Sequence, residues 1–250
     1  YPDGILTWSH LWFVAYLFVF TYLLLPVFAL FRWKPLQELK LKTNALFRSP
    51  WMVFGLVVTL TWYYLTLYIH WPEQGSLLGD WFVFMFSITL FFYGWWVSDL
   101  PAFWDTCLTY RWHFLTVALI TFGWLMGTFW WNFELPKEEG PRLIAYSLAD
   151  SIHIWSIILA ALGFAKQHLN FTNPVLQYAT PAVYPYYILH QTVIVASGYY
   201  VVQWDRPIAL KLLVLIVICF GTVGVLYQFL IRRTMLTRVL YGLKPKEKRG

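Results

Sequence analysis

Charge is the scarcest property of this sequence. Only 12% of its 250 residues are Asp, Glu, Lys or Arg, whereas about a quarter of an average soluble domain is charged. Hydrophobic residues make up 60% of the chain and aromatic residues 22%. The composition therefore excludes an ordinary soluble domain and indicates an integral membrane protein.

Cysteine is also rare. The two cysteines, Cys107 and Cys219, are too few for a disulfide framework, and we expect two buried thiols. No CxxC pair and no histidine pair at i,i+4 spacing supplies local metal ligands, so we predict no metal site. The net charge of +6 comes from basic residues between and after apolar runs, without a nucleic-acid-binding module around them. We therefore expect no nucleic acid partner.

The sequence has no conventional start. It begins with Tyr1, and no signal peptide with a basic start and a small-residue cleavage site precedes the first apolar run. We therefore expect the chain to be a fragment or a trimmed form of a longer protein.

The apolar residues form runs long enough to cross a bilayer as helices, which takes roughly 20 residues. The runs do not alternate with a period of two, so a barrel is not indicated. Tryptophan residues mark the ends of several runs, as interfacial anchoring predicts. We predict an all-α, polytopic transmembrane helix bundle in one membrane domain over residues 1–250, with about seven spans at 11–31, 51–71, 81–98, 114–131, 143–164, 182–203 and 208–231.

The distribution of Lys and Arg predicts the orientation of these spans, because cytoplasmic loops retain positive charge. On one side lie Arg32, Lys34, Lys40, Lys42, Arg48, Arg111, Lys166, Arg232, Arg233, Arg238, Lys244, Lys246, Lys248 and Arg249. The other side carries Lys137, Arg142, Arg206 and Lys211. The N-terminus is therefore predicted outside and the C-terminus in the cytoplasm.

Two segments between spans carry features of the membrane interface. The loop 99–113 mixes aromatic and polar residues, which favours a short interfacial helix. Asn173, Pro174 and Pro181 flank a short segment, VLQYAT, that we expect to lie in the interface before the sixth span.

Asp150 is the one carboxylate deep within a predicted span, where a charge usually faces a bundle interior or a water-filled cavity. His153 follows at helical spacing and lies roughly 15 Å from the outer end of the span. The pair has two interpretations. The carboxylate orients the imidazole for proton transfer, or both groups are hydrogen-bonded and tie this helix to its neighbours.

The sixth span contains the run YPYYILHQTVIV, in which Tyr187, His190 and Gln191 bring polar groups into an apolar helix. His190 lies roughly 12 Å from the cytoplasmic end of the span. We therefore expect His190 and His153 to meet at a similar depth and to form a polar pocket within the membrane. His10 and Trp12, at the outer entry of the first span, are a third candidate position.

The segments HLWFVAYL at 10–17 and VYPYYILHQTVIV at 183–195, with RRTMLTRVLYG after the last span, resemble the membrane acyltransferase-3 family. The likeness is greatest to its glucan biosynthesis protein C type branch. It covers essentially the whole chain, which corresponds to the C-terminal seven of about ten helices. His10, Trp12, Tyr187 and His190 match recurrent family positions, whereas Asp150 and His153 come from the residues alone.

The resemblance implies an O-acyltransferase of a bacterial inner or plasma membrane. It would move an acetyl or succinyl group from a cytoplasmic donor, acyl-CoA, to a hydroxyl of an extracytoplasmic glycan or polysaccharide. No bound cofactor is expected. The family's proposed catalytic histidine lies in its first helix, which this sequence does not contain. We therefore expect this chain alone to be inactive, and His190, Gln191 and Tyr187 to be hydrogen-bond donors or pocket residues.

Three other classes compete with this interpretation. A receptor or a retinal-binding pump has the same predicted topology, but Lys211 lies too near the outer end of its span for a buried Schiff base, and Asn173-Pro174 lies in a loop. A proton-coupled transporter that uses Asp150 and His153 is the stronger alternative. A non-catalytic assembly subunit is the third.

Overall fold

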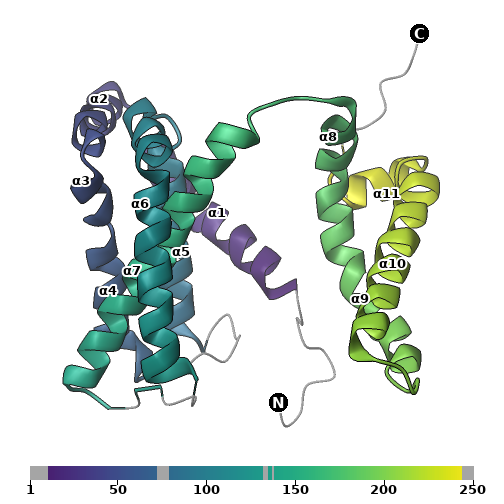
Figure 1. The fold of residues 1–250 in the computed structure, drawn as a ribbon. Helices are drawn as coiled ribbons and strands as arrows, with labels where there is room; N and C mark the ends of the chain where they lie inside the picture. The colour runs from purple at the N-terminus through teal and green to yellow at the C-terminus, as the bar shows by residue number, and fades with distance from the viewer. Residues whose placement is uncertain (1–10, 72–78, 132–134, 137, 244–250) are drawn as a thin grey trace. The chain divides into compact units, whose positions relative to one another are not determined.

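The computed structural model describes residues 11–71, 79–131, 135–136 and 138–243, except for the side chain of Trp12. Within these residues every regular element is a helix (Figure 1). The predicted all-α class is therefore confirmed. The chain divides into two compact units, Tyr1–Asn170 and Phe171–Gly250, which are described separately below.

The helices of the first unit follow the predicted apolar runs closely, except that α6 begins well before its predicted run. They are α1 (Trp12–Leu30), α2 (Lys34–Lys42), η2 (Thr43–Arg48), α3 (Pro50–Phe54), α4 (Val57–Tyr63), η3 (Tyr64–Tyr68), α5 (Trp81–Val97), α6 (Pro101–Leu125), η4 (Met126–Trp130) and α7 (Pro141–His168). The second unit contains α8 (Pro174–Ala179), η5 (Thr180–Ala182), α9 (Val183–Val201), α10 (Ile208–Leu226), η6 (Tyr227–Ile231) and α11 (Met235–Leu240).

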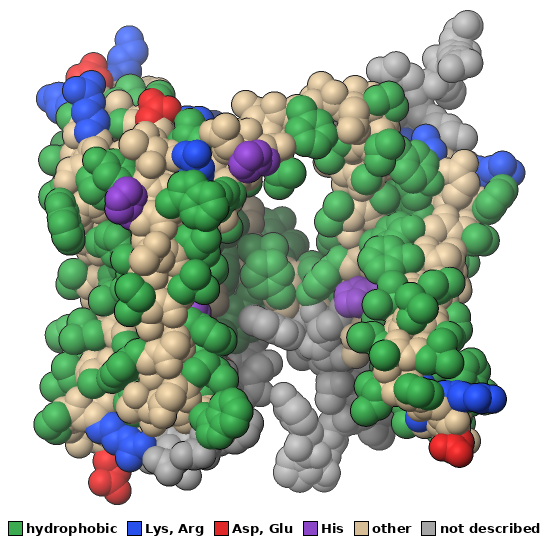
Figure 2. All heavy atoms as spheres, viewed as in Figure 1, with side chains coloured by type: hydrophobic (Ala, Val, Ile, Leu, Met, Phe, Trp, Pro, Cys, Tyr) green, Lys and Arg blue, Asp and Glu red, His purple; other side chains and the backbone are tan. Residues whose placement is uncertain are grey.

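Among the residues that the structure describes, five helical segments are long and apolar enough to cross a membrane: Phe13–Leu30, Pro50–Tyr68, Pro101–Trp130, Pro141–His168 and Ile208–Ile231. Helix α5 is apolar but has 17 residues, and α9 carries the polar residues of the YPYYILHQTVIV run. In each unit, hydrophobic side chains cover the length of the helices and charged ones gather at their ends (Figure 2). The chain is thus an integral membrane protein, and the count of seven spans stays a prediction.

Helix α6 corrects one predicted border. The segment 99–113 was expected to be a loop with a short helix, and 114 was expected to begin the span. Instead, one helix begins at Pro101 and continues into η4. Proline suits the first helical turn, and the Asn44 side chain accepts a hydrogen bond from the backbone of Ala102 at 2.9 Å. Polar residues of this segment do not interrupt the helix. Thr106, for example, donates a hydrogen bond from its side chain to the Phe47 carbonyl at 2.7 Å.

Helices α6 and α7 form the closest pair in the first unit. A Cβ atom added to Gly163 of α7 would lie 2.3 Å from the carbonyl oxygen of Cys107 on α6. Glycine at this position therefore lets the two backbones approach, as small residues do between membrane helices. Two turns earlier on α7, the indole of Trp155 donates to the carbonyl of Val53 at 3.0 Å, which ties α7 to α3.

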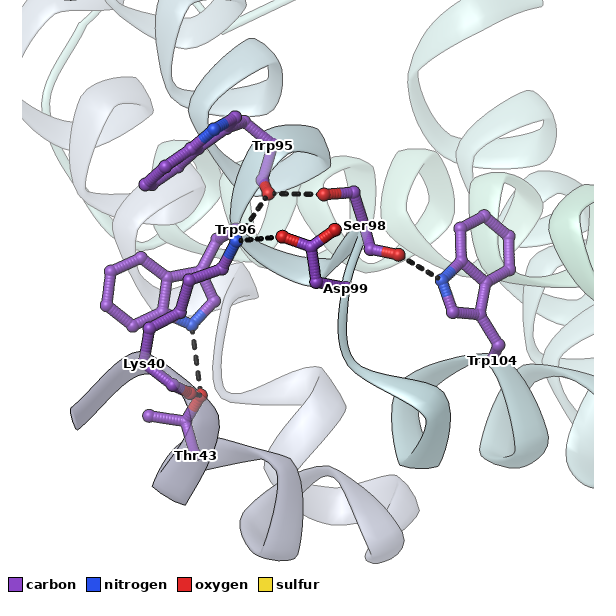
Figure 3. Close-up of polar contacts among 7 residues, drawn as sticks. All are labelled: Lys40, Thr43, Trp95, Trp96, Ser98, Asp99 and Trp104. Carbon is purple, nitrogen blue, oxygen red and sulfur yellow. Dashed lines mark hydrogen bonds and ion pairs between the residues drawn. The ribbon is translucent and has the colours of Figure 1, made fainter. Parts of the chain in front are cut away.

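Helix α2 is held to the end of α5 by Lys40, which is only 4% exposed (Figure 3). Its ammonium donates to Asp99 at 2.9 Å and to the Trp95 carbonyl at 3.2 Å, and lies 4.3 Å from the centre of the Trp95 ring. The indole of Trp96 donates to Thr43 at 3.1 Å. The hydrogen bond from Lys40 lowers the pKa of the Asp99 carboxyl. The basic linker is therefore a fixed part of the fold.

Candidate functional site

Asp150 lies on the buried face of α7 with 5% of its surface exposed. Its Oδ2 accepts a hydrogen bond from the hydroxyl of Tyr64, the first residue of η3. This element is a π-helix, and such single turns are frequent at functional positions. The contact ties the buried carboxyl of α7 to the α4–η3 helix.

His153 lies one turn further along α7 and contacts a different helix. Its Nδ1 lies 3.0 Å from the carbonyl of Ala118 and 3.3 Å from the hydroxyl of Thr121, both on α6. Because a carbonyl only accepts, Nδ1 is the donor in the contact with Ala118. The hydrogen bonds of Asp150 and His153 thus run to different helices, which favours the role of tying helices together over that of an oriented carboxylate and imidazole.

Further hydroxyl groups lie inside the first unit. Ser147 donates to the carbonyl of Leu143 at 2.7 Å, one turn earlier on α7. The hydroxyls of Thr61, Ser151 and Ser156 are buried and have no hydrogen-bond partner within the described part of the chain. The interior of this unit therefore contains several buried hydroxyl groups besides the side chains of Asp150 and His153.

His190 is positioned differently, beside a cavity of about 570 Å³ within the second unit. Its Nδ1 lies 2.7 Å from the carbonyl of Tyr187 and 3.1 Å from that of Tyr186, both on the preceding turn of α9. Because carbonyl oxygens only accept, Nδ1 donates to them and these contacts orient the ring. In the neutral imidazole, Nε2 is then the nitrogen that accepts a hydrogen bond.

The cavity has an aromatic wall with polar tips. It is lined by Tyr178, Ala179, Ala182, Val183, Tyr186, Tyr187, His190, Ile194, Cys219 and Phe220. The thiol of Cys219 faces the backbone carbonyl of His190 at 3.9 Å, and both cysteines of the chain are buried, as expected. The hydroxyl of Tyr186 lies over Gly224, where an added Cβ would be 2.8 Å away. Residues of α8, α9 and α10 thus form one pocket.

The structure places the predicted site residues in separate groups. Tyr187 and His190 share the cavity of the second unit, and Gln191 follows on α9, half-buried and outside the cavity lining. Asp150 and His153 belong to the first unit. The expected meeting of His153 and His190 stays a prediction. His10 lies outside the described residues, and Trp12 begins α1 without a described side chain.

Sequence reasoning missed Tyr64, Tyr178 and Cys219. Tyr64 is 86 positions from the carboxyl that it contacts, and no local pattern indicates that pairing. Tyr178 and Cys219 come from helices on either side of α9 in the sequence. Because consecutive helices usually pack together, the sequence indicates which helices line the cavity. It does not indicate which of their residues do so.

The described residues contain no group of three or more His, Cys, Asp or Glu that could hold a metal ion. The model of acyltransferase family 3, described as an acyltransferase domain, matches residues 1–231. The match includes residues of both units. No curated protein matches the chain significantly. No solved structure does so either.

Proposed function

The chain belongs to the membrane acyltransferase-3 family, and from this premise we propose that it transfers an acetyl or succinyl group to a hydroxyl of an extracytoplasmic glycan. As a membrane acyltransferase it uses an acyl donor and an acceptor. We propose acyl-CoA from the cytoplasm as the donor and a bacterial plasma membrane as the location. The likeness of VYPYYILHQTVIV to the glucan biosynthesis branch supports a polysaccharide acceptor.

The oriented imidazole of His190 in the second-unit cavity is the observation that carries this proposal. Its Nδ1–H is held by the carbonyls of Tyr186 and Tyr187, so Nε2 can accept a hydrogen bond from an acceptor hydroxyl. The sequence suggested a donor or pocket residue at this position, and the two carbonyl contacts of Nδ1 support an accepting role for Nε2. A hydroxyl held in this way is positioned for attack on a bound thioester.

The transfer itself is an ordinary acyl substitution. The acceptor oxygen forms a bond with the thioester carbonyl carbon and the carbon–sulfur bond breaks. The hydroxyl proton passes to a general base and then to the departing thiolate. We assign His190 to holding the hydroxyl and Tyr187, which lines the same cavity, to donating a hydrogen bond to the developing oxyanion.

A proton-coupled transporter is less well supported. That function would use Asp150 and His153 as proton carriers. Their hydrogen bonds to Tyr64 and to the Ala118 carbonyl hold them in the interior of the helix bundle. Family membership also favours acyl transfer.

Substitution of His190 in the full-length protein tests the proposed function. Purified protein in proteoliposomes is given a labelled acyl-CoA and an oligosaccharide acceptor, and the label in the glycan is counted. For His190→Asn we expect about a 100-fold lower turnover, because the acceptor hydroxyl loses its oriented partner. His168→Ala, at the exposed end of α7, is the matched control and should retain full turnover. Normal turnover by a folded His190→Asn protein would remove His190 from the site.

A further inference from the structure

Arg232 borders the second-unit cavity, and Arg233 and Arg238 follow it closely in the sequence, so that the three form an arginine cluster. The guanidinium carbon of Arg232 lies 5.0 Å from the centre of the Tyr178 ring, and Tyr178 lines the cavity. Gln228 fixes this arrangement, since its Oε1 accepts from Arg232 at 3.1 Å and from the Tyr178 hydroxyl at 3.0 Å. Arg232 is therefore positioned against an aromatic wall that it shares with the His190 pocket.

The field around this cluster is strongly positive. Arg238 donates to the backbone carbonyl of Arg232 at 3.1 Å, and Arg233 lies 4.9 Å from the centre of the Phe229 ring. Residues 171–243 contain a single carboxylate, Asp205. It lies in the loop between α9 and α10, at the opposite end of α10 from the arginines. The guanidinium groups therefore set the potential at this end of the unit and attract an anion.

An aromatic series connects the cluster with the region around His190. Ring centres are separated by 6.0 Å between Phe220 and Tyr186, by 6.4 Å between Tyr186 and Tyr227, and by 5.6 Å between Tyr227 and Tyr178. From Phe220 to Arg232 the helix advances roughly 18 Å at 1.5 Å per residue. The dimensions fit an elongated ligand with an anionic end and an uncharged arm.

The tyrosine tips distinguish this cavity from the one in the first unit. That cavity has a volume of about 540 Å³ and is lined by Trp51, Phe54, Val57, Val58, Thr61, Trp62, Leu65, Val117, Leu148 and Ile152. Its lining has Thr61 as the one hydroxyl-bearing side chain. By contrast, the His190 cavity presents three tyrosines and an imidazole. Such a wall combines apolar rings with a few hydrogen-bonding groups, so it accepts a largely uncharged arm that carries some polar atoms.

We propose that Arg232, supported by Arg233 and Arg238, binds a phosphate of the acyl donor, so that the donor's arm lies along the tyrosine wall and its thioester reaches His190. The inference rests on the proposed function and specifies the donor as a thioester on a phosphorylated arm. Guanidinium groups bind phosphate through paired, charge-assisted hydrogen bonds. The ring of Tyr178 and the amide of Gln228 hold Arg232 in place for this contact.

A comparison of two donors tests this inference. The full-length protein, in nanodiscs of zwitterionic lipid, is assayed with an acyl-CoA and with the same acyl group on pantetheine, which carries no phosphate. Arg232→Gln should raise the KM for the CoA thioester by about 10-fold or more, the cost of one lost charge-assisted contact. It should leave kcat and the KM for the pantetheine thioester unchanged. Lys211→Gln, at the opposite end of α10, should change neither KM.

The same design separates the competing outcomes. An equal KM increase for both thioesters would overturn the inference and indicate a structural role. A second outcome is that anionic lipid stabilises the wild type but not Arg232→Gln, while the substitution changes neither KM. This outcome would overturn the inference and identify a lipid headgroup as the ligand. If the variant fails to fold, the salt dependence of the wild type decides, because only the KM of the CoA thioester should rise with salt. Equal salt dependence would also overturn the inference.

Failure of the proposed function gives a different result. In that case the wild type transfers acyl groups from neither thioester. Calorimetric binding of CoA and of pantetheine then still tests Arg232. Tighter binding of CoA that Arg232→Gln abolishes would support the phosphate site, and equal binding of both would contradict it.

Discussion

The two units of the chain place polar groups in the membrane for different purposes. In the first unit, the Asp150 carboxyl and the His153 imidazole form hydrogen bonds to neighbouring helices. In the second unit, Nδ1 of His190 contacts the carbonyl of Tyr187 one turn back along its own helix, and the side chain lines a cavity of about 570 Å³. The first arrangement ties neighbouring helices together, whereas the second holds an imidazole beside a cavity, where we propose that it binds the acceptor hydroxyl.

This difference shows that depth in the membrane does not by itself identify a functional residue. Asp150 is the more conspicuous polar residue in the sequence because a buried carboxylate is costly. The structure gives it the Tyr64 hydroxyl as a partner inside the protein. His190 is less conspicuous, but its Nδ1 contacts with two backbone carbonyls orient the ring beside a cavity. A change in the first unit should therefore affect stability and a change at His190 should affect turnover.

The largest effect on stability is expected at Gly163. Replacement by Ala would place a Cβ 2.3 Å from the Cys107 carbonyl, so α6 and α7 must separate. We expect a loss of about 3 kcal/mol, the upper end of the usual range for overpacking. A thermal unfolding curve of the purified protein in nanodiscs measures it. Gly123→Ala in α6, where no atom lies within 4 Å of the added Cβ, should be neutral or stabilising, and equal melting of the two variants would contradict this account.

A smaller loss is expected when the buried carboxyl loses one of its hydrogen bonds. Tyr64→Phe removes the hydroxyl that donates to Asp150, whereas the hydrogen bond with Tyr146 remains. The loss of a hydrogen bond to a buried charged group costs about 1 to 3 kcal/mol. Tyr22→Phe on α1, where the ring is 59% exposed, is the control and should melt with the wild type. An unchanged melting temperature for Tyr64→Phe, measured in the same way, would show that the contact does not stabilise the bundle.

The smallest effect is expected at the Lys40–Asp99 ion pair. The pKa of Asp99 is lowered by its hydrogen bond from Lys40, so the pair stabilises the folded protein above the ordinary carboxyl pKa of about 4. This contribution is lost as the pH falls through the lower pKa of the folded state. Because the Asp99 side chain is 69% exposed, Asp99→Asn should cost less than about 1 kcal/mol at neutral pH. The wild type and Asp99→Asn should differ in melting temperature at neutral pH and should melt alike once the pH falls below the pKa of Asp99. A constant difference at all pH values would contradict the assignment.

Much of the fold could be predicted from the sequence, because the length of an apolar run and the tryptophans at its ends are local features. The run 208–231 coincides with α10 and η6, and the run 81–98 nearly coincides with α5. The border at 114 was wrong because polar residues such as Thr106 find partners at the helix surface. Their composition resembles that of a loop, although the helix continues.

The candidate site was only partly predictable. Tyr187 and His190 could be named because they stand out in a short apolar run that resembles a family motif. Tyr178 and Arg232 could not be joined to them, because the contact depends on how η6 packs against α8. Likewise, the pairing of Asp150 with Tyr64 depends on the packing of two helices that are far apart in the sequence. Non-local contacts of this kind are set by tertiary packing and leave no periodic signal.

The most direct test measures turnover and melting temperature on the same preparations of His190→Asn and Tyr64→Phe. The account predicts that His190→Asn lowers acyl transfer about 100-fold while its melting temperature stays at that of the wild type. Tyr64→Phe should melt earlier and retain near-normal transfer at temperatures where it is folded. If Tyr64→Phe loses transfer while folded and His190→Asn retains it, the functional site lies in the first unit and the central claim is wrong.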